Sequence, residues 1–185
     1  MQWPANPFWD YCLDLYGRPA VEAACLELQR RHGLDVNLVL FCCWLGHRGI
    51  EADDPLLAAA RRASEGWQIE VVRPLRSARR RLKATLANPA ADSIQERWPE
   101  LVSQLRERVL ELEIDAERLA QLNLAKVGED AAAIHRAGVR LASANLCCYW
   151  SFGAQDRHAL QSLLAAAFPA ATELEMRASF SWADD

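Results

Sequence analysis

Glycine and proline are scarce in this chain, with eight of each among 185 residues, and long alternating runs of β-branched residues are absent. Strands are recognised by such runs and the turns between them by glycine and proline, so a β-rich fold is disfavoured. The longest apolar stretch, VNLVLFCCWL at 36–45, is about half of the roughly 20 residues that a membrane-spanning helix needs. The sequence therefore predicts an all-α protein with no membrane span.

The chain also lacks the usual signals of secretion and catalysis. Its N-terminus, MQWPANPFWDYC, has no basic segment followed by an apolar run, so we expect a cytoplasmic protein whose cysteines are thiols. The motifs HExxH, ExxH, GxGxxG, GxSxG and the phosphate-binding P-loop do not occur. No cofactor is indicated, and the sequence favours a non-catalytic role without deciding the question.

What the chain does contain is helical periodicity along most of its length. This pattern, with a net charge of only −4, predicts a single helical domain over residues 1–185, built as a bundle of six to seven helices. The segment 36–45 is apolar on every side except at Asn37, so we expect it to be the buried central helix. Residues from about 170 to 185 are expected to form a loose tail.

A long antiparallel helical hairpin is expected at about 67–127. In its second helix, apolar residues recur at steps of three and four and form a seam of about four heptads. The seam consists of Ile94, Trp98, Leu101, Leu105, Val109, Leu112, Ala116, Leu119 and Leu122. The segment from Val71 to Leu86 has the same spacing, and ANPAADS at 87–93 is the connection. Because a heptad seam does not identify its partner, the hairpin would serve a homodimer equally well.

The clearest polar feature is the run VRPLRSARRRLK at 72–83, which contains no acidic residue. Four of its cations fall at steps of three and four, which places them on one stripe of a helix. This stripe consists of Arg73, Arg76, Arg80 and Lys83. The second helix of the hairpin is rich in glutamate, so one interpretation is that both charge sets are solvated flanks that partly pair with each other. The other is that the stripe binds an anionic partner.

An acidic protein is the favoured partner for such a stripe. Nucleic acid is a less favoured alternative, because no aromatic residue is interleaved with the cations to stack on bases and the whole chain is acidic. The leading hypothesis is therefore a non-catalytic interaction or adaptor protein. It would act through the basic hairpin, with Arg76, Arg80 and Lys83 as the principal contacts.

Adjacent cysteines occur twice, at 42–43 and 147–148. Neither pair has CxxC spacing, and free cysteine behaves as a small hydrophobe, so the plain interpretation is that the two helices carrying them pack closely together. The alternative is a Cys2His2 site of the kind that zinc accepts. Its candidate ligands are Cys43, His47, Cys148 and His158. Gly46 argues against this site, because we expect the helix to end there, before His47.

A second hypothesis is a small-molecule or metal-binding protein, or an enzyme, with a site between the helices that carry Cys43 and Cys148. Polar residues beside apolar helices need hydrogen-bond partners. Helix capping and mutual hydrogen bonding satisfy this need in the plain interpretation, and Asp35 has the position of an N-cap. The alternative is a small pocket at the helix ends, which would be lined by Arg18, Asp35 and Asn37.

Three motifs stand close together near the start of the chain: FWD at 8–10, LYGRP at 15–19 and GLDVNLVLFCCWLG at 33–46. With these motifs, the segment 8–49 resembles the start of a family of short proteobacterial proteins, which are conserved hypothetical proteins with a domain of unknown function. The resemblance extends weakly over about 150 residues. It implies a bacterial cytosolic protein, and it brings no activity, cofactor or active-site residue with it.

Overall fold

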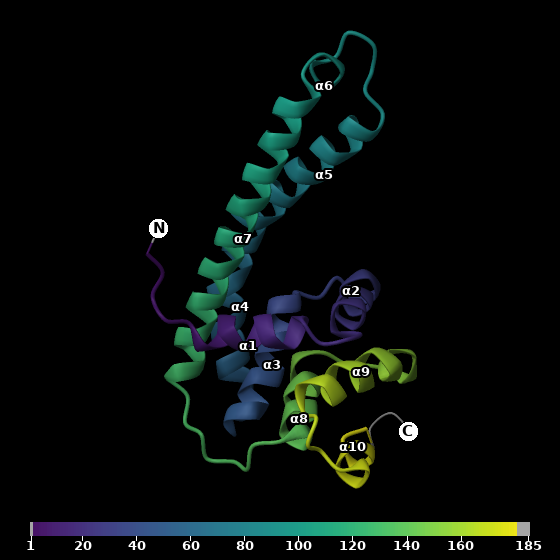
Figure 1. Ribbon diagram of the computed structural model, residues 1–185. Coiled ribbons are helices and arrows are strands. Elements are labelled where there is room, and N and C mark those ends of the chain that lie inside the picture. The colour runs from purple at the N-terminus through teal and green to yellow at the C-terminus, as the bar shows by residue number, and fades with distance from the viewer. Residues whose placement is uncertain (1, 181–185) are drawn as a thin grey trace. The chain divides into compact units, whose positions relative to one another are not determined.

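The computed structural model describes residues 2–180 of the chain (Figure 1), and every regular element in this range is a helix. The all-α class and the long helical hairpin predicted from the sequence are confirmed. The elements in chain order are α1 (Pro7–Tyr16), α2 (Val21–His32), α3 (Val36–Arg48), α4 (Asp54–Trp67), η1 (Gln68–Val72), α5 (Arg73–Ala87), α6 (Ile94–Arg97), α7 (Pro99–Glu129), α8 (Val139–Tyr149), η2 (Ala154–Asp156), α9 (Arg157–Ala167) and α10 (Glu173–Ala178). No helix in the described part of the chain is both long enough and apolar enough to cross a membrane.

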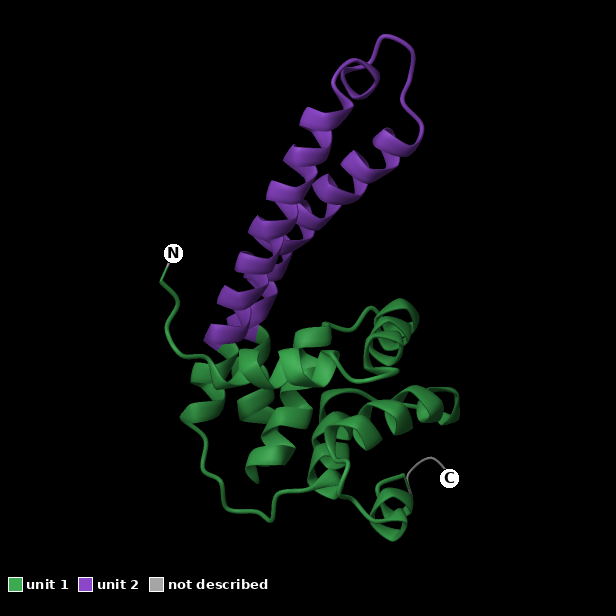
Figure 2. Ribbon diagram, viewed as in Figure 1, with its two compact units in different colours: residues 1–61, 124–185 green, residues 62–123 purple. Residues whose placement is uncertain are grey.

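The chain divides into two compact units, which are coloured separately in Figure 2. Unit 1 comprises residues 1–61 and 124–185, and unit 2 comprises residues 62–123. The boundaries fall within α4 and α7, so each of these helices contributes residues to both units. That residues 1–185 act as one domain stays a prediction.

The core of unit 1 is built around α3, in which every residue from Asn37 to Gly46 is buried. Burial on all sides confirms the prediction of a central helix. The helix begins at Asp35, whose carboxylate accepts a hydrogen bond from the backbone N–H of Asn37. It ends at Gly49, which has a φ of 73° in the left-handed region that glycine adopts readily.

The prediction that Gly46 ends α3 is wrong, because this glycine serves packing instead. A Cβ atom at position 46 would lie 2.5 Å from the Cα atom of Ala142 in α8. Figure 1 shows α8 beside α3, and the missing side chain is what lets the two backbones approach this closely. The expected close packing of these helices is therefore confirmed.

Helix α8 begins at Val139, and a non-helical segment precedes it. Backbone hydrogen bonds hold this segment against the end of α3, from His135 N–H to the Gly49 carbonyl and from Gly138 N–H to the Gly46 carbonyl. The segment contains three consecutive alanines, which favour a helix, but these tertiary contacts outweigh that local propensity.

Helices α4, η1 and α5 follow one another without a break, although Gly66 and Pro74 are residue types that disfavour a helix interior. The five residues of η1 form a π-helix, and the N–H of Arg73 reaches back to the carbonyl of Gln68. Proline lacks an N–H and crowds the carbonyl four residues before it. A wider π turn just before Pro74 lets the helical path continue through this position.

The second helix of the hairpin is divided where the sequence predicted continuity. Ser93 caps α6 by accepting a hydrogen bond from the N–H of Glu96, as an N-cap should. Trp98 then leaves the helical region, with φ of −136° and ψ of 52°, because Pro99 restricts the residue before it.

Near the C-terminus, Thr172 and Glu175 form a capping box at the start of α10, within the expected tail, and residues 181–185 lie outside the described range.

Candidate interaction surface

Unit 2 is a two-helix hairpin in which α5 and α7 run side by side (Figure 1). Helix α5 has no fully buried residue, whereas α7 buries one face that includes Val102, Glu113, Ala116 and Ala120. The indole N–H of Trp67 donates to the carbonyl of Ala116 at 2.8 Å and so joins the end of α4 to α7. A pair of helices with so little buried apolar surface needs polar contacts to fix its register.

Glu113 supplies these polar contacts, with only 7% of its side chain exposed. Its carboxylate accepts hydrogen bonds from Arg76 Nε at 3.0 Å and from Arg79 Nε at 2.5 Å, and Arg76 also pairs with Glu117. Burial alone raises the pKa of Glu113, but the hydrogen bonds from Arg79 and Arg76 outweigh it and hold this pKa below its ordinary value. We call these four residues the Glu113 clamp.

The structure separates the predicted basic stripe into two parts. Arg76 belongs to the Glu113 clamp and is half-buried, whereas Arg73, Arg80 and Lys83 are exposed. Arg80 lies seven positions after Arg73, and Lys83 lies three positions after Arg80, so the three exposed cations share one flank of α5. We call Arg73, Arg80 and Lys83 the basic flank.

A second exposed surface is made of residues of the apolar seam that the hairpin itself leaves uncovered. The sequence did not identify these residues, since it left open whether the seam serves the hairpin or a homodimer. Besides Ile94 in α6 (69%), five side chains of the seam are largely exposed: Trp98 (54%), Leu101 (59%), Leu105 (50%), Leu112 (55%) and Leu119 (42%). Leu105, Leu112 and Leu119 are seven positions apart and align along one side of α7, and Trp98 lies just before the first residue of this helix. We call these five residues the α7 apolar stripe. The signal was present in the sequence, since the apolar arc of this helix includes Val102, Val109 and Ala116 and is wider than one neighbouring helix can cover.

The two exposed surfaces lie on opposite flanks of the hairpin. Arg76 lies on α5 between Arg73 and Arg80, at steps of three and four residues, and so on the same side of the helix as the basic flank. It pairs with Glu117 on α7. Leu112 is five positions before Glu117, which corresponds to about 140° around the helix at about 100° per residue. The α7 apolar stripe therefore turns away from the side on which Arg76 and Glu117 meet.

The family model described as "Protein of unknown function (DUF2390)" matches residues 7–124, which is well over half of the chain. The chain belongs to the DUF2390 family. The match confirms the resemblance seen at residues 8–49 and extends it over the whole of unit 2. No curated protein and no solved structure matches the chain.

The cysteines of this DUF2390 protein divide by burial. Cys42 and Cys43 are fully buried in α3, and desolvation raises the pKa of both thiols. Cys148, in contrast, is exposed on α8. A buried thiol with a raised pKa is a poor nucleophile and a poor metal ligand, because both roles need the thiolate.

The proposed Cys2His2 ligands do not assemble. Among residues 2–180, no group of three or more His, Cys, Asp or Glu side chains is arranged to hold a metal ion. His47 is exposed at the end of α3, where its ring lies 5.7 Å from that of Tyr11, and His158 is exposed on α9.

The three residues expected to line a small pocket take structural contacts instead. Arg18 donates to the backbone carbonyl of Ala166 and pairs with Asp14 at 2.6 Å. Asp35 caps α3, and its own N–H donates to the hydroxyl of Tyr149 at 3.3 Å. Asn37 is buried in the first turn of α3. These contacts are those of helix ends and loops fastened to their neighbours.

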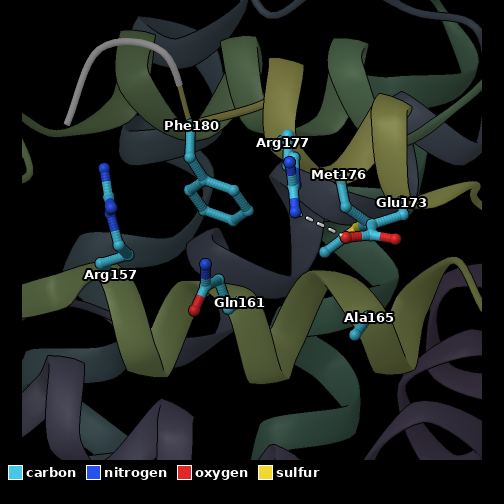
Figure 3. A pocket seen from close by; sticks show the side chains of 7 residues that line it. All are labelled: Arg157, Gln161, Ala165, Glu173, Met176, Arg177 and Phe180. Atoms are coloured by element: carbon cyan, nitrogen blue, oxygen red, sulfur yellow. Dashed lines mark hydrogen bonds and ion pairs between the residues drawn. The ribbon is translucent and has the colours of Figure 1, made fainter. Parts of the chain in front are cut away.

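A cleft of about 460 Å³ lies between α9 and α10 (Figure 3). Its lining residues are Arg157, Gln161, Ala165, Glu173, Met176, Arg177 and Phe180. Arg177 donates to Glu173 at 2.8 Å within this lining, so these two charges neutralise each other. The lining contains no histidine, cysteine or serine, so it offers none of the usual nucleophile and base pairs.

A buried charge cluster joins α2 to the start of α9. The carboxylate of Asp156 is fully buried and accepts hydrogen bonds from Arg31 at 2.7 Å, His32 Nε2 at 2.9 Å and the Gly153 N–H at 2.9 Å. Desolvation raises the pKa of Asp156, but these hydrogen bonds outweigh it and hold the pKa below its ordinary value. All donors come from the chain itself, so the cluster is an anchor between helices.

Proposed function

We propose that this protein is a non-catalytic adaptor that binds an acidic protein through the basic flank of α5. The observation that carries the proposal is the difference between two sets of cations on this helix. Those that face α7 are paired with its glutamates, whereas Arg73, Arg80 and Lys83 are exposed. Cations held on a helical scaffold attract an anionic surface and orient it as it docks.

In this proposal Arg76 is no longer a partner contact, as the sequence suggested, but a residue that holds the hairpin together. Its guanidinium already bonds Glu113 and Glu117, so a partner carboxylate would have to displace both. Arg76 instead fixes α5 against α7 and so keeps the basic flank in place.

An acidic protein fits the basic flank better than nucleic acid does. Helix α5 contains no aromatic residue that would stack on bases, and the chain carries a net charge of −4 that repels a polyanion as a whole. Three cations also neutralise few phosphates, whereas a specific protein contact needs only a small complementary patch.

The test is a pull-down with the full-length protein from nuclease-treated lysate, followed by affinity measurement with each purified candidate. The wild type is compared with a triple variant, Arg73→Glu, Arg80→Glu and Lys83→Glu. The matched control places the same charge change on exposed cations of unit 1, as Arg30→Glu, Arg136→Glu and Arg140→Glu.

The expected result is one acidic protein bound by the wild type and the control, with affinity for the triple variant lower by at least about 100-fold. The same partners for all three proteins would remove the basic flank from the proposal. Binding to generic RNA or DNA at about 50 mM salt, with a steep loss of affinity as salt rises, would support the nucleic-acid alternative instead.

A further inference from the structure

The α7 apolar stripe is only partly covered within the chain, because its five side chains remain about half exposed. We propose that it is a self-association surface, through which a second copy of this chain binds in an antiparallel orientation. The pairing would place α7 of one copy along α7 of the other and bury both stripes.

The size of the stripe suits a specific contact between two copies. Five side chains that each expose roughly 100 Å² of apolar surface amount to about 1,000 Å² in a symmetric pair, which is near the lower limit for a specific interface. The stripe of one copy, about 500 Å², is comparable with the largest apolar patch of a typical monomer, and such a patch is often a binding site. The regular seven-residue spacing also matches helix-on-helix packing, because it keeps one seam facing its partner along the whole contact.

Two charges within the seam indicate what covers it. Arg108 and Asp115 stand three positions after Leu105 and Leu112, so they occupy the alternate places in the same heptad seam. Arg108 is exposed and Asp115 is half-buried. An occupant of this seam must therefore bring an anion to Arg108 and a cation to Asp115, seven residues apart.

A second copy supplies this complement when it runs antiparallel. A two-fold axis beside residues 111 and 112 brings Arg108 of each copy to Asp115 of the other, and both ion pairs form at once. The same axis sets Leu101 opposite Leu122 of the partner subunit. A parallel pair would instead oppose Arg108 to Arg108 and Asp115 to Asp115, which costs stability. A self-complementary patch of this kind is what a two-fold dimer requires.

This inference does not depend on the proposed adaptor function, since the two surfaces lie on opposite flanks of α5 and α7. Loss of the basic flank should leave self-association intact, and loss of the α7 apolar stripe should leave the basic flank exposed. The two proposals can therefore fail separately.

The first experiment is sedimentation velocity of the full-length protein over a range of concentrations, compared with a Leu105→Glu, Leu112→Glu variant. Since the chain has a mass of 20.8 kDa, we expect a species of about twice this mass that dissociates on dilution. The variant should weaken association by at least about 100-fold, because it places four carboxylates in the apolar contact.

The matched control is Leu13→Glu, Leu26→Glu, which alters two leucines of unit 1 with similar exposure, 57% and 48%. We expect it to associate as the wild type does. Circular dichroism of all three proteins checks that the helices remain folded. A wild type that stays monomeric up to about 1 mM would overturn the proposal, since contacts weaker than this are not specific. Equal loss in the control would overturn it as well.

The second experiment tests the orientation with charge reversals. Either Arg108→Asp or Asp115→Arg alone should weaken an antiparallel pair by about tenfold, since each puts like charges at two contacts. Both changes together should restore wild-type association. In a parallel pair neither single change alters the number of like-charge contacts, so unchanged association in both single variants would overturn the antiparallel arrangement.

Discussion

Replacing Glu113 with glutamine tests whether the Glu113 clamp holds the hairpin together. The change keeps the size of the side chain and removes its charge, so Arg76 and Arg79 lose a carboxylate that is almost fully buried. A hydrogen bond to a charged group contributes about 1.5–3 kcal/mol. Each guanidinium here is about a quarter exposed, and Arg76 keeps Glu117, so water and that second carboxylate recover part of the loss. We expect Glu113→Gln to lower the opening free energy of unit 2 by about 2 kcal/mol.

Hydrogen–deuterium exchange of the full-length protein measures this opening free energy locally. A loss of about 2 kcal/mol corresponds to roughly 30-fold faster exchange in peptides of residues 99–123, while peptides of α3 should remain unchanged. The control is Glu107→Gln, because Glu107 is an exposed glutamate of the same helix. Equal loss of protection in α3 and α7, or equal loss with Glu107→Gln, would refute the clamp.

The pH dependence gives a second test of the same reasoning. The pKa of Glu113 in the folded protein lies below its ordinary value, so the ionised carboxylate stabilises the fold at pH values above the unfolded pKa, about 4.3. This stabilisation is lost as the pH falls through the lower, folded pKa. The difference between wild type and Glu113→Gln should therefore be constant near neutral pH and should shrink as the pH falls below about 4. A difference that stays constant to pH 3 would contradict the ionic origin.

Three further predictions concern unit 1. Gly46→Ala should lower the free energy of unfolding by about 1–3 kcal/mol in thermal or urea unfolding, because the new methyl group meets Ala142, and an unchanged midpoint would refute the close packing. Asp156→Asn should cost about 2–3 kcal/mol at neutral pH in the same assay, because the hydrogen bonds from Arg31, His32 and the Gly153 N–H lose a fully buried carboxylate; an equal cost from changing an exposed aspartate would refute the anchor. Cys148 should react with iodoacetamide in the native state, whereas Cys42 should react only after unfolding, as mass spectrometry of the labelled peptides will show.

The sequence predicted the features that depend on apolar periodicity. The helical class, the hairpin and the central position of 36–45 all follow from a single pattern that repeats over many residues, so local exceptions do not change the outcome. Residues whose main effect is local were harder to interpret. Gly46 suggested a helix end, yet it serves a close helix crossing. Pro74 is of a type that breaks helices, yet it follows a π turn through which the helical path continues.

The candidate surfaces show the same limit in another form. The four cations of the basic stripe share one spacing, and only the position of Glu113 on the facing helix separates Arg76 from the exposed members. That separation depends on the register of α5 against α7. The periodic pattern of each helix indicates its apolar face, but it does not fix how the two helices are aligned along their length. The exposure of Leu105 and Leu112 was hidden for a related reason, because a heptad seam has the same appearance whether one neighbouring helix or two cover it.

Pairing through α7 would change how the proposed adaptor binds, because each dimer would present two copies of the basic flank. A soluble partner with one acidic site would bind each flank independently, whereas a surface coated with that partner would be held by both flanks at once. The Leu105→Glu, Leu112→Glu variant leaves Arg73, Arg80 and Lys83 unchanged. It should therefore lower affinity for the coated surface by about 100-fold and leave affinity for the soluble partner unchanged, as surface plasmon resonance and calorimetry would measure. If affinity for the soluble partner falls equally, the α7 apolar stripe contacts that partner directly, and the assignment of the two flanks to separate roles is wrong.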